Sequence, residues 1–484
     1  MKTIIKKQKI LLTGATGYIG RRLKHKLLDD ENVELRVLVR HCGALSEAVR
    51  KQAQVFEGST FDVDVLNKSM QGVDVAYYLI HSLGHDDYAE RDRISAKNFR
   101  EAAVKAGVKK IIYLGGLGVI NKDTSEHLLS RIETGEILSA DPDNVDVIWF
   151  RAGVIIGSGS ASFEIIRNLI QKLPIMITPK WVRTKAQPIG VEDVISYLEH
   201  AKVDTLKKSH IVDIGSEQLC YQEMMHECAK VMGLKRFIIP VPFLSIGLSS
   251  YWLNIFTPVP FNVASSLIKG VRSEVIVQND NAAKLFSDIH PASFKQSIEK
   301  ALLEAEENQV ISRWSDRGND VWETDHKDSI ANAVFIDRQV LPLGNLSEHD
   351  VHQSYLGIGG ENGWFSYDWL WVLRGFFDKL TGGAGINRGR RLQHELRVGD
   401  SLDFWKVIDI QDDERLLLYA QMRVPGKAWL EFKIHEGNLI QSAYFLPNGV
   451  IGRVYWYALV PLHYLVFRDM IRSVLKKART ISDS

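Results

Sequence analysis

Three glycines spaced three residues apart follow the first apolar run of the chain, at Gly14, Gly17 and Gly20. In this spacing the first glycine allows a tight turn, the second lets the backbone approach a pyrophosphate, and the third permits close packing of helix on strand. The helix that follows offers free N–H groups and the positive end of its dipole to phosphates. The pattern predicts a dinucleotide site built from Gly14, Ala15, Thr16, Gly17, Tyr18, Ile19 and Gly20.

An arginine stands where the next apolar run ends, at Arg40. Sites that prefer NAD place an acidic residue there to hold the ribose 2′-hydroxyl, whereas an arginine suits a 2′-phosphate through charge-assisted hydrogen bonds. We therefore expect NADP as the cofactor, with NAD possible. The alternative is that Arg40 is a solvated strand end.

The elements that position these residues alternate along the first 200 residues. Five β-rich runs are separated by amphipathic segments, such as residues 88–106, which Gly107 closes; the runs are residues 9–14, 34–40, 73–80, 109–116 and 145–153. Strands that alternate with helices predict an α/β fold with a parallel, doubly wound sheet.

The chain changes character after about residue 310, and eight of its eleven tryptophans lie beyond that point. We predict a first domain over residues 1–310, with a small substrate lobe, and a second over residues 330–484. The second shows a helical pattern at 365–380 and a glycine-rich loop at 381–391. Short strand-like runs and a long apolar helix follow, at residues 402–410, 415–422, 428–435, 438–447 and 449–477. This order predicts an α+β domain with an antiparallel meander.

Composition limits the kinds of partner that the chain is expected to bind. Lys plus Arg is 60 and Asp plus Glu is 59, so the chain has no overall basic footprint for nucleic acid. Its three cysteines form neither a CxxC pair nor a Cys/His zinc pattern, which predicts no metal site and a reducing, cytoplasmic location. The apolar stretch 450–467 contains Arg453 and Pro461, so we expect a buried or interfacial helix rather than stable membrane insertion. The oligomeric state stays open.

The motifs TGATGYIG, LVR, GVDVAYYLIHSLG and RAGVIIGSG resemble the short-chain dehydrogenase/reductase superfamily, and its extended and atypical (NmrA-like) branches most. The resemblance covers about residues 8–300. It implies that Leu79, Ile80 and His81 line the ribose and nicotinamide side of the cofactor, and that Gly115 borders the same site. It also implies that residues 58–62 lie near the adenine, where Ser59 replaces the usual aspartate.

The superfamily's catalytic residues are a serine or threonine followed by Tyr-x-x-x-Lys, in which the tyrosine exchanges the proton. Here Gly115 and Gly116 stand at the serine position, and His127-x-x-x-Arg131 is the best match to the second motif. His127 is therefore a candidate acid/base, with Arg131 orienting the cofactor, because an imidazole titrates near neutral pH. His81 is the second candidate. The alternatives are a helix-surface pair for His127 and Arg131, and a hydrogen-bonded loop histidine for His81.

The second domain resembles a bacterial domain of unassigned function that is fused behind atypical reductases. Its helix, antiparallel strands and long final helix are similar to the START or polyketide-cyclase helix-grip fold, which leaves an apolar cavity under the last helix. Candidate lining residues, which could equally fill the core, are Trp405, Trp429, Phe432, Tyr444 and Tyr457.

Together these features favour an NADP-dependent oxidoreductase of atypical short-chain type that acts on an apolar or aromatic small molecule. The alternative is a non-catalytic NADP(H)-binding sensor or regulator whose C-terminal domain binds a hydrophobic ligand.

Overall fold

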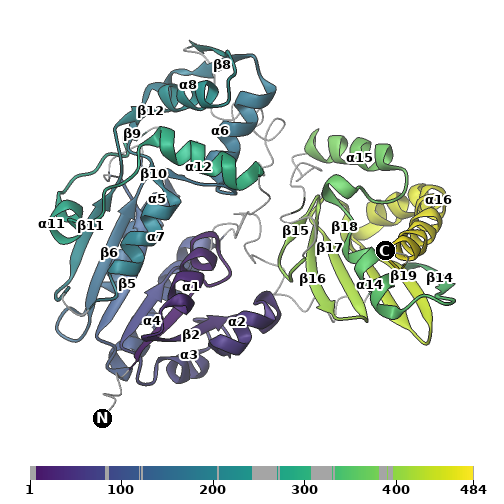
Figure 1. Ribbon diagram of the computed structural model, residues 1–484, viewed down its shortest axis with the longest axis horizontal. Helices are drawn as coiled ribbons and strands as arrows, with labels where there is room; N and C mark the ends of the chain where they lie inside the picture. Colours follow the sequence, from purple (N-terminus) through teal and green to yellow (C-terminus); the bar gives the residue numbers. More distant parts are fainter. Residues whose placement is uncertain are drawn as a thin grey trace. The chain divides into compact units, whose positions relative to one another are not determined.

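The computed structural model describes residues 7–81, 87–118, 120, 124–203, 206–241, 270, 273–306, 330, 333–380, 390 and 396–482. The chain divides into two compact units, Met1–Asn319 and Asp320–Ser484 (Figure 1). Each unit has its own hydrophobic core, so each is treated by itself.

The first unit is built on a parallel sheet, which within the described residues has seven strands in the order β11-β6-β5-β4-β1-β2-β3. All five predicted runs form strands of this sheet, and β3 and β11 are additions to the prediction. The strands are β1 (Gln8–Thr13), β2 (Val33–Val39), β3 (Gln54–Glu57), β4 (Val75–Tyr78), β5 (Lys110–Gly116), β6 (Asp146–Ala152) and β11 (His210–Ile214).

Helices cover both faces of this sheet, as the doubly wound prediction requires (Figure 1). Helices α1, α2 and α7 pack on one face of the sheet through Leu23, Val49 and Val194. Helices α3, α4 and α5 pack on the other face through Leu66, Phe99 and Ile132. Helix α4 ends at Gly107, as the sequence predicts. The helices are α1 (Tyr18–Asp29), α2 (Glu47–Gln52), α3 (Val63–Met70), α4 (Tyr88–Ala106), α5 (Glu126–Leu138), α7 (Val191–His200) and α11 (Asn281–Leu285).

A small lobe follows the sheet and has its own core around Phe163, Met224 and Phe294. Its longer helices are amphipathic, and they bury their apolar faces against one another and against short strand pairs. The lobe contains β7 (Ile155–Ile156), α6 (Ala161–Lys172), β8 (Ile175–Pro179), β9 (Lys185–Ala186), β10 (Ile189–Gly190), β12 (Leu219–Cys220), α8 (Tyr221–Val231), β13 (Phe237–Val241) and α12 (Phe294–Glu306).

The second unit is an antiparallel sheet with helices, and its described part contains six strands in the order β14-β19-β18-β17-β16-β15. The predicted meander is present, and β14 adds an edge strand that the sequence did not reveal. The elements are β14 (Phe335–Pro342), α14 (Glu348–Leu356), α15 (Asp368–Leu380), β15 (Ser401–Leu402), β16 (Trp405–Gln411), β17 (Arg415–Ala420), β18 (Gly426–His435), β19 (Asn438–Pro447) and α16 (Gly449–Ser482). Of the predicted loop 381–391, the described residues include Arg390 alone.

The final helix α16 packs on one face of this sheet through a stripe in its second half, which includes Phe467, Met470 and Val474. Arg453, Arg468 and Lys476 are exposed, in keeping with the cost of burying an unpaired charge.

The five candidate cavity-lining aromatics do not surround one space. Trp405 and Phe432 belong to the core between the sheet and α16, whereas Trp429 and Tyr444 lie in a smaller cluster. Successive strand residues point to opposite faces, so this smaller cluster lies on the other side of the sheet. Tyr457 is 65% exposed on α16. The five candidates therefore do not line a single cavity, and four of them fill hydrophobic cores, which is the alternative given with the candidates.

Candidate cofactor and active site

The glycine turn joins β1 to α1 at the carboxyl end of the sheet. Gly14 has a φ of +73°, which favours glycine, and its carbonyl oxygen accepts a 2.9 Å hydrogen bond from the Gly17 amide. A Cβ on Gly14 would collide with the Leu79 carbonyl group, and one on Gly20 with the Gly14 carbonyl group. At Gly17 the Gly14 oxygen, 3.2 Å away, is the one atom of the described residues within 4 Å of such a Cβ. The turn is thus packed on its inner side and open at Gly17, which fits a pyrophosphate.

The other residues of the turn hold it in place. Ala15 is buried, Ile19 packs against the same core, and the Thr16 carbonyl oxygen accepts a 2.9 Å hydrogen bond from Arg21 Nε. The Tyr18 hydroxyl donates to the Ser158 carbonyl oxygen over 3.1 Å, and burial raises the pKa of Tyr18. Tyr18 therefore stays neutral and ties α1 to the segment after β7.

The predicted adenine side lies at the ends of β2 and β3. Arg40 directly follows β2, and the Gly58 amide donates a 2.8 Å hydrogen bond to the Val39 carbonyl oxygen. The Ser59 hydroxyl accepts from the Phe61 amide over 3.2 Å. Arg40 and Ser59 thus lie at neighbouring strand ends, where the resemblance puts the adenosine half of the cofactor.

The ends of β4 and β5 are joined by Arg131, which reaches them from α5. Its guanidinium donates to the Ile80 carbonyl oxygen over 3.4 Å and to the Leu114 carbonyl oxygen, and it lies 5.0 Å from the centre of the Tyr113 ring. Arg131 is therefore not a helix-surface residue. Its described contacts are with the protein's own backbone and with Tyr113, so it positions the strand ends that border Leu79, Ile80 and Gly115.

The two candidate histidines lie together beside these strand ends. The rings of His81 and His127 stack with centroids 4.6 Å apart and planes 28° apart. His81 Nδ1 lies 3.2 Å from Oδ2 of Asp92, a carboxylate from α4 that is 2% exposed. Ser130 donates to the same oxygen over 3.2 Å. A carboxylate on Nδ1 orients an imidazole and leaves Nε2 to change its protonation.

Asp92 is the member of this group that the sequence analysis missed. It lies on the buried stripe of α4 together with Ala96, Phe99 and Ala103. A carboxylate at such a position needs a partner, because an unpaired buried charge is costly. Its place in that stripe was the available signal.

The structure also explains why a serine is missing at Gly115. A Cβ there would lie 2.5 Å from Trp149 Nε1 and 3.0 Å from the Tyr113 ring, so the indole fills the place of a side chain. Tyr113 is no substitute acid, since burial raises its pKa to about 12 and its hydroxyl donates to the Arg131 carbonyl oxygen over 2.8 Å.

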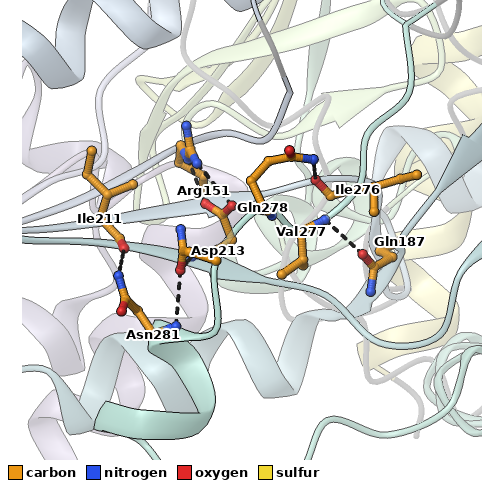
Figure 2. Close-up of polar contacts among 9 residues, drawn as sticks. Arg151, Gln187, Ile211, Asp213, Ile276, Val277, Gln278 and Asn281 are labelled. Atoms are coloured by element: carbon orange, nitrogen blue, oxygen red, sulfur yellow. Dashed lines mark hydrogen bonds and ion pairs between the residues drawn. The ribbon is translucent and has the colours of Figure 1, made fainter.

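A cluster of polar side chains lies at the edge of the sheet formed by β6 and β11 (Figure 2). Arg151 on β6 makes a bidentate pair with the buried Asp213 on β11, at 2.6 and 3.0 Å, and Asp213 also accepts from the Gln278 amide over 2.8 Å. Gln187 accepts from the Val277 amide over 2.8 Å. These hydrogen bonds hold residues 276–278 against the strand ends. The contact of Gln187 is with this segment of the protein itself.

The parallel sheet, the glycine turn and the helix behind it define an NAD(P)H-binding domain of Rossmann type. Residues 14–142 match the model of a family described as NAD(P)H-binding, and residues 329–470 match a family described as a protein of unknown function, DUF2867.

The chain is similar in sequence to two named reductases, and its first unit is similar in fold to one solved structure. Over 240 residues the chain is 26% identical to a ceramide reductase from Caulobacter vibrioides, which covers 48% of this chain and 73% of that protein. It is 22% identical over 273 residues to a (4-alkanoyl-5-oxo-2,5-dihydrofuran-3-yl)methyl phosphate reductase from Streptomyces griseus, covering 55% and 86%. A nucleoside-diphosphate-sugar epimerase from Staphylococcus aureus aligns with a TM-score of 0.50 at 16% identity, over 60% of this chain and all of the other. This last similarity supports the fold of the first unit.

Proposed function

We propose that this protein is an NADP-dependent oxidoreductase of atypical short-chain type that uses a histidine pair in place of the tyrosine triad. The observation that carries the proposal is the Asp92–His81–His127 group beside the strand ends that border the glycine turn. Two relatives are named reductases, and the named substrate of one is a ceramide, which favours an apolar substrate here.

In this proposal each residue has one task. The bound nicotinamide supplies or accepts the hydride. The glycine turn binds the pyrophosphate and Arg40 binds the 2′-phosphate. His81 moves the proton at Nε2 while Asp92 holds Nδ1, and the His127 ring stacks against the His81 ring and keeps it in place. Arg131 keeps the ends of β4 and β5 in register.

The second candidate is a cytoplasmic NADP(H)-binding sensor whose C-terminal unit binds a hydrophobic ligand. It is favoured by the loss of all three triad residues and by the backbone contacts of Arg131. The antiparallel sheet packed against a long helix is consistent with a helix-grip domain in either case, although the candidate aromatics lie on both faces of the sheet.

To test the histidine pair, the protein is saturated with NADPH and assayed for NADPH oxidation with a series of long-chain and aromatic ketones. For any ketone that oxidises NADPH, His81→Asn is expected to lower kcat by roughly 100-fold or more, the usual contribution of a general acid. The NADPH dissociation constant should not change, and neither should the kcat of the control His200→Asn, which alters an exposed histidine on α7. An unchanged kcat in His81→Asn would exclude the proposed proton route. Tight NADPH binding without oxidation by any ketone would favour the sensor.

Cofactor choice is tested at Arg40. Arg40→Asp is expected to weaken NADPH binding by about 1.5–3 kcal/mol, the value of a hydrogen bond to a charged group. NADH affinity should stay the same or improve, since the aspartate can accept from a ribose hydroxyl. Fluorescence titration of both cofactors measures this, with Arg50→Asp as a control of equal charge change on α2. Equal NADPH and NADH affinities that Arg40→Asp leaves unaltered would contradict the 2′-phosphate assignment.

A further inference from the structure

Helix α15 carries its apolar stripe on the outside. From Trp369 to Phe377 every exposed side chain is apolar, and the exposed positions follow helical spacing: Trp369, Val372, Leu373, Phe376 and Phe377. Trp369 is 64% exposed and Phe376 is 55% exposed. The opposite side of the helix carries the buried Asp378, whose carboxylate accepts a 2.6 Å hydrogen bond from the Arg423 amide. On the inner side Leu370 and Trp371 also pack against the core. Helix α15 therefore has an apolar outer stripe in addition to its apolar inner side, unlike an ordinary surface helix.

The first half of α16 is exposed and apolar as well. Among the described residues α16 is the one helix long and apolar enough to cross a membrane, yet only 22% of its most apolar stretch is buried. The large apolar side chains that it exposes are Val450, Ile451, Val454, Tyr457, Val460, Leu462, Tyr464 and Leu465.

The outward side of α16 changes abruptly from apolar to cationic at Arg468. Between residues 450 and 467 Arg453 is the single exposed charge, whereas beyond them the exposed charges are Arg468, Asp469, Arg472, Lys476 and Arg479. The Arg468 guanidinium donates to the Tyr464 hydroxyl over 2.7 Å at this boundary. The apolar segment therefore contains one cation near its start, Arg453, and is followed by a group of cations from Arg468 onward.

Contacts at both ends of α15 place it along the first half of α16. Just before α15 begins, the Ser366 hydroxyl donates to the Val466 carbonyl oxygen over 3.1 Å. At its far end Asp378 binds Arg423, two residues before Pro425, and the Pro425 carbonyl oxygen accepts from the Asn448 amide over 2.9 Å. The two ends of α15 are therefore linked to the two ends of segment 448–466, with opposite chain directions. We call the exposed apolar residues of these two segments together the α15–α16 face.

We propose that the α15–α16 face docks on the surface of an anionic lipid bilayer, with both helices lying in the plane of the interface. A large apolar surface on a soluble unit marks an interaction site. Tryptophan and tyrosine favour the boundary between lipid and water, where Trp369, Tyr457 and Tyr464 would lie. The excess of cations beyond residue 467 matches lipid phosphates. Arg453 and Pro461 interrupt the apolar segment, which suits an in-plane helix better than a spanning one.

The test is co-sedimentation of the full-length protein with phosphatidylcholine vesicles, with or without phosphatidylglycerol. The double variant Trp369→Glu/Phe376→Glu is expected to lower vesicle binding at least about tenfold. The control Ile336→Glu/Val340→Glu changes two exposed apolar residues of β14 that point away from α16, and it should bind like the unaltered protein. This orientation follows because Phe335, which directly precedes Ile336 and so points to the opposite face of the strand, stacks on Trp456 of α16. Arg472→Glu/Lys476→Glu should weaken binding to the anionic vesicles in particular.

Each other outcome overturns the proposal. If the protein binds neither kind of vesicle, the face is not a lipid surface. If it instead forms a dimer that Trp369→Glu/Phe376→Glu dissociates, the occupant is a second copy. If bound protein resists alkaline carbonate and needs detergent for release, α16 is inserted across the bilayer. Near-ultraviolet circular dichroism of each variant establishes that the second unit is folded.

Discussion

Gly17→Ala is expected to weaken NADPH binding by at least about tenfold, which corresponds to ~1.4 kcal/mol, and to leave thermal stability nearly unchanged. The new methyl group would meet the Gly14 carbonyl oxygen at 3.2 Å and would otherwise project into the open side of the turn. The backbone at Gly17 has φ −77°, which alanine adopts readily. The added Cβ therefore obstructs the approach of the pyrophosphate without disturbing the fold. Fluorescence titration and a thermal melt measure the two effects.

Gly107→Ala is the matched control, and it should show the opposite pair of effects. Gly107 follows α4 with φ +71°, and no atom of the described part of the chain lies within 4 Å of an added Cβ. A left-handed alanine costs about 1 kcal/mol, so the melting temperature should fall while NADPH affinity is preserved. If Gly17→Ala lowers stability as much as Gly107→Ala and binds NADPH normally, the pyrophosphate does not lie at Gly17.

Ending the chain after Asn448 is expected to unfold the second unit. This truncation removes α16, which supplies Val466, Phe467, Met470, Ile471, Val474, Leu475 and Ala478 to the core of that unit. Loss of one such side chain costs about 2–5 kcal/mol, so loss of all of them exceeds the stability of an ordinary domain. Limited proteolysis and near-ultraviolet circular dichroism should report a disordered second unit.

The control truncation ends at Arg479 and retains every core residue of α16. It should melt like the full chain. A soluble, protease-resistant protein that ends at Asn448 would show that the sheet folds without α16, and it would exclude a helix-grip arrangement.

The sheet of the first unit was largely predictable because its central strands are long apolar runs next to glycine turns. β3 and β11 were missed for a physical reason. β3 has four residues and no fully buried side chain, and β11 belongs to the sheet through its pairing with β6. β14 alternates half-buried and exposed residues as an edge strand does, but its sequence, FIDRQVLP, mixes charges with apolar residues on its open face. Such strands depend on their neighbours more than on their own sequence.

The candidate site was predictable as a set of residues but not as an arrangement. Local spacing placed His127 and Arg131 on one helical face, and the resemblance placed His81 at a strand end. The stack of His81 on His127 and the pairing with Asp92 join the end of β4 to α4 and α5, so they depend on how these elements pack. Arg131 was expected at the cofactor, and its described contacts are backbone carbonyl groups and the Tyr113 ring, because the ends of β4 and β5 lie within its reach.

The Trp149 indole beside Gly115 limits the substitutions that position 115 tolerates. A serine cannot enter position 115 alone, because its Cβ would lie 2.5 Å from Trp149 Nε1. A smaller residue at 149 alone would leave a cavity beside Gly115 and Gly135. Such a cavity in the core lowers the free energy of unfolding. Each of these two single substitutions is therefore unfavourable, whereas a smaller side chain at 149 combined with Gly115→Ser removes the 2.5 Å contact. A serine at position 115 is therefore expected to be tolerated only together with a change at Trp149.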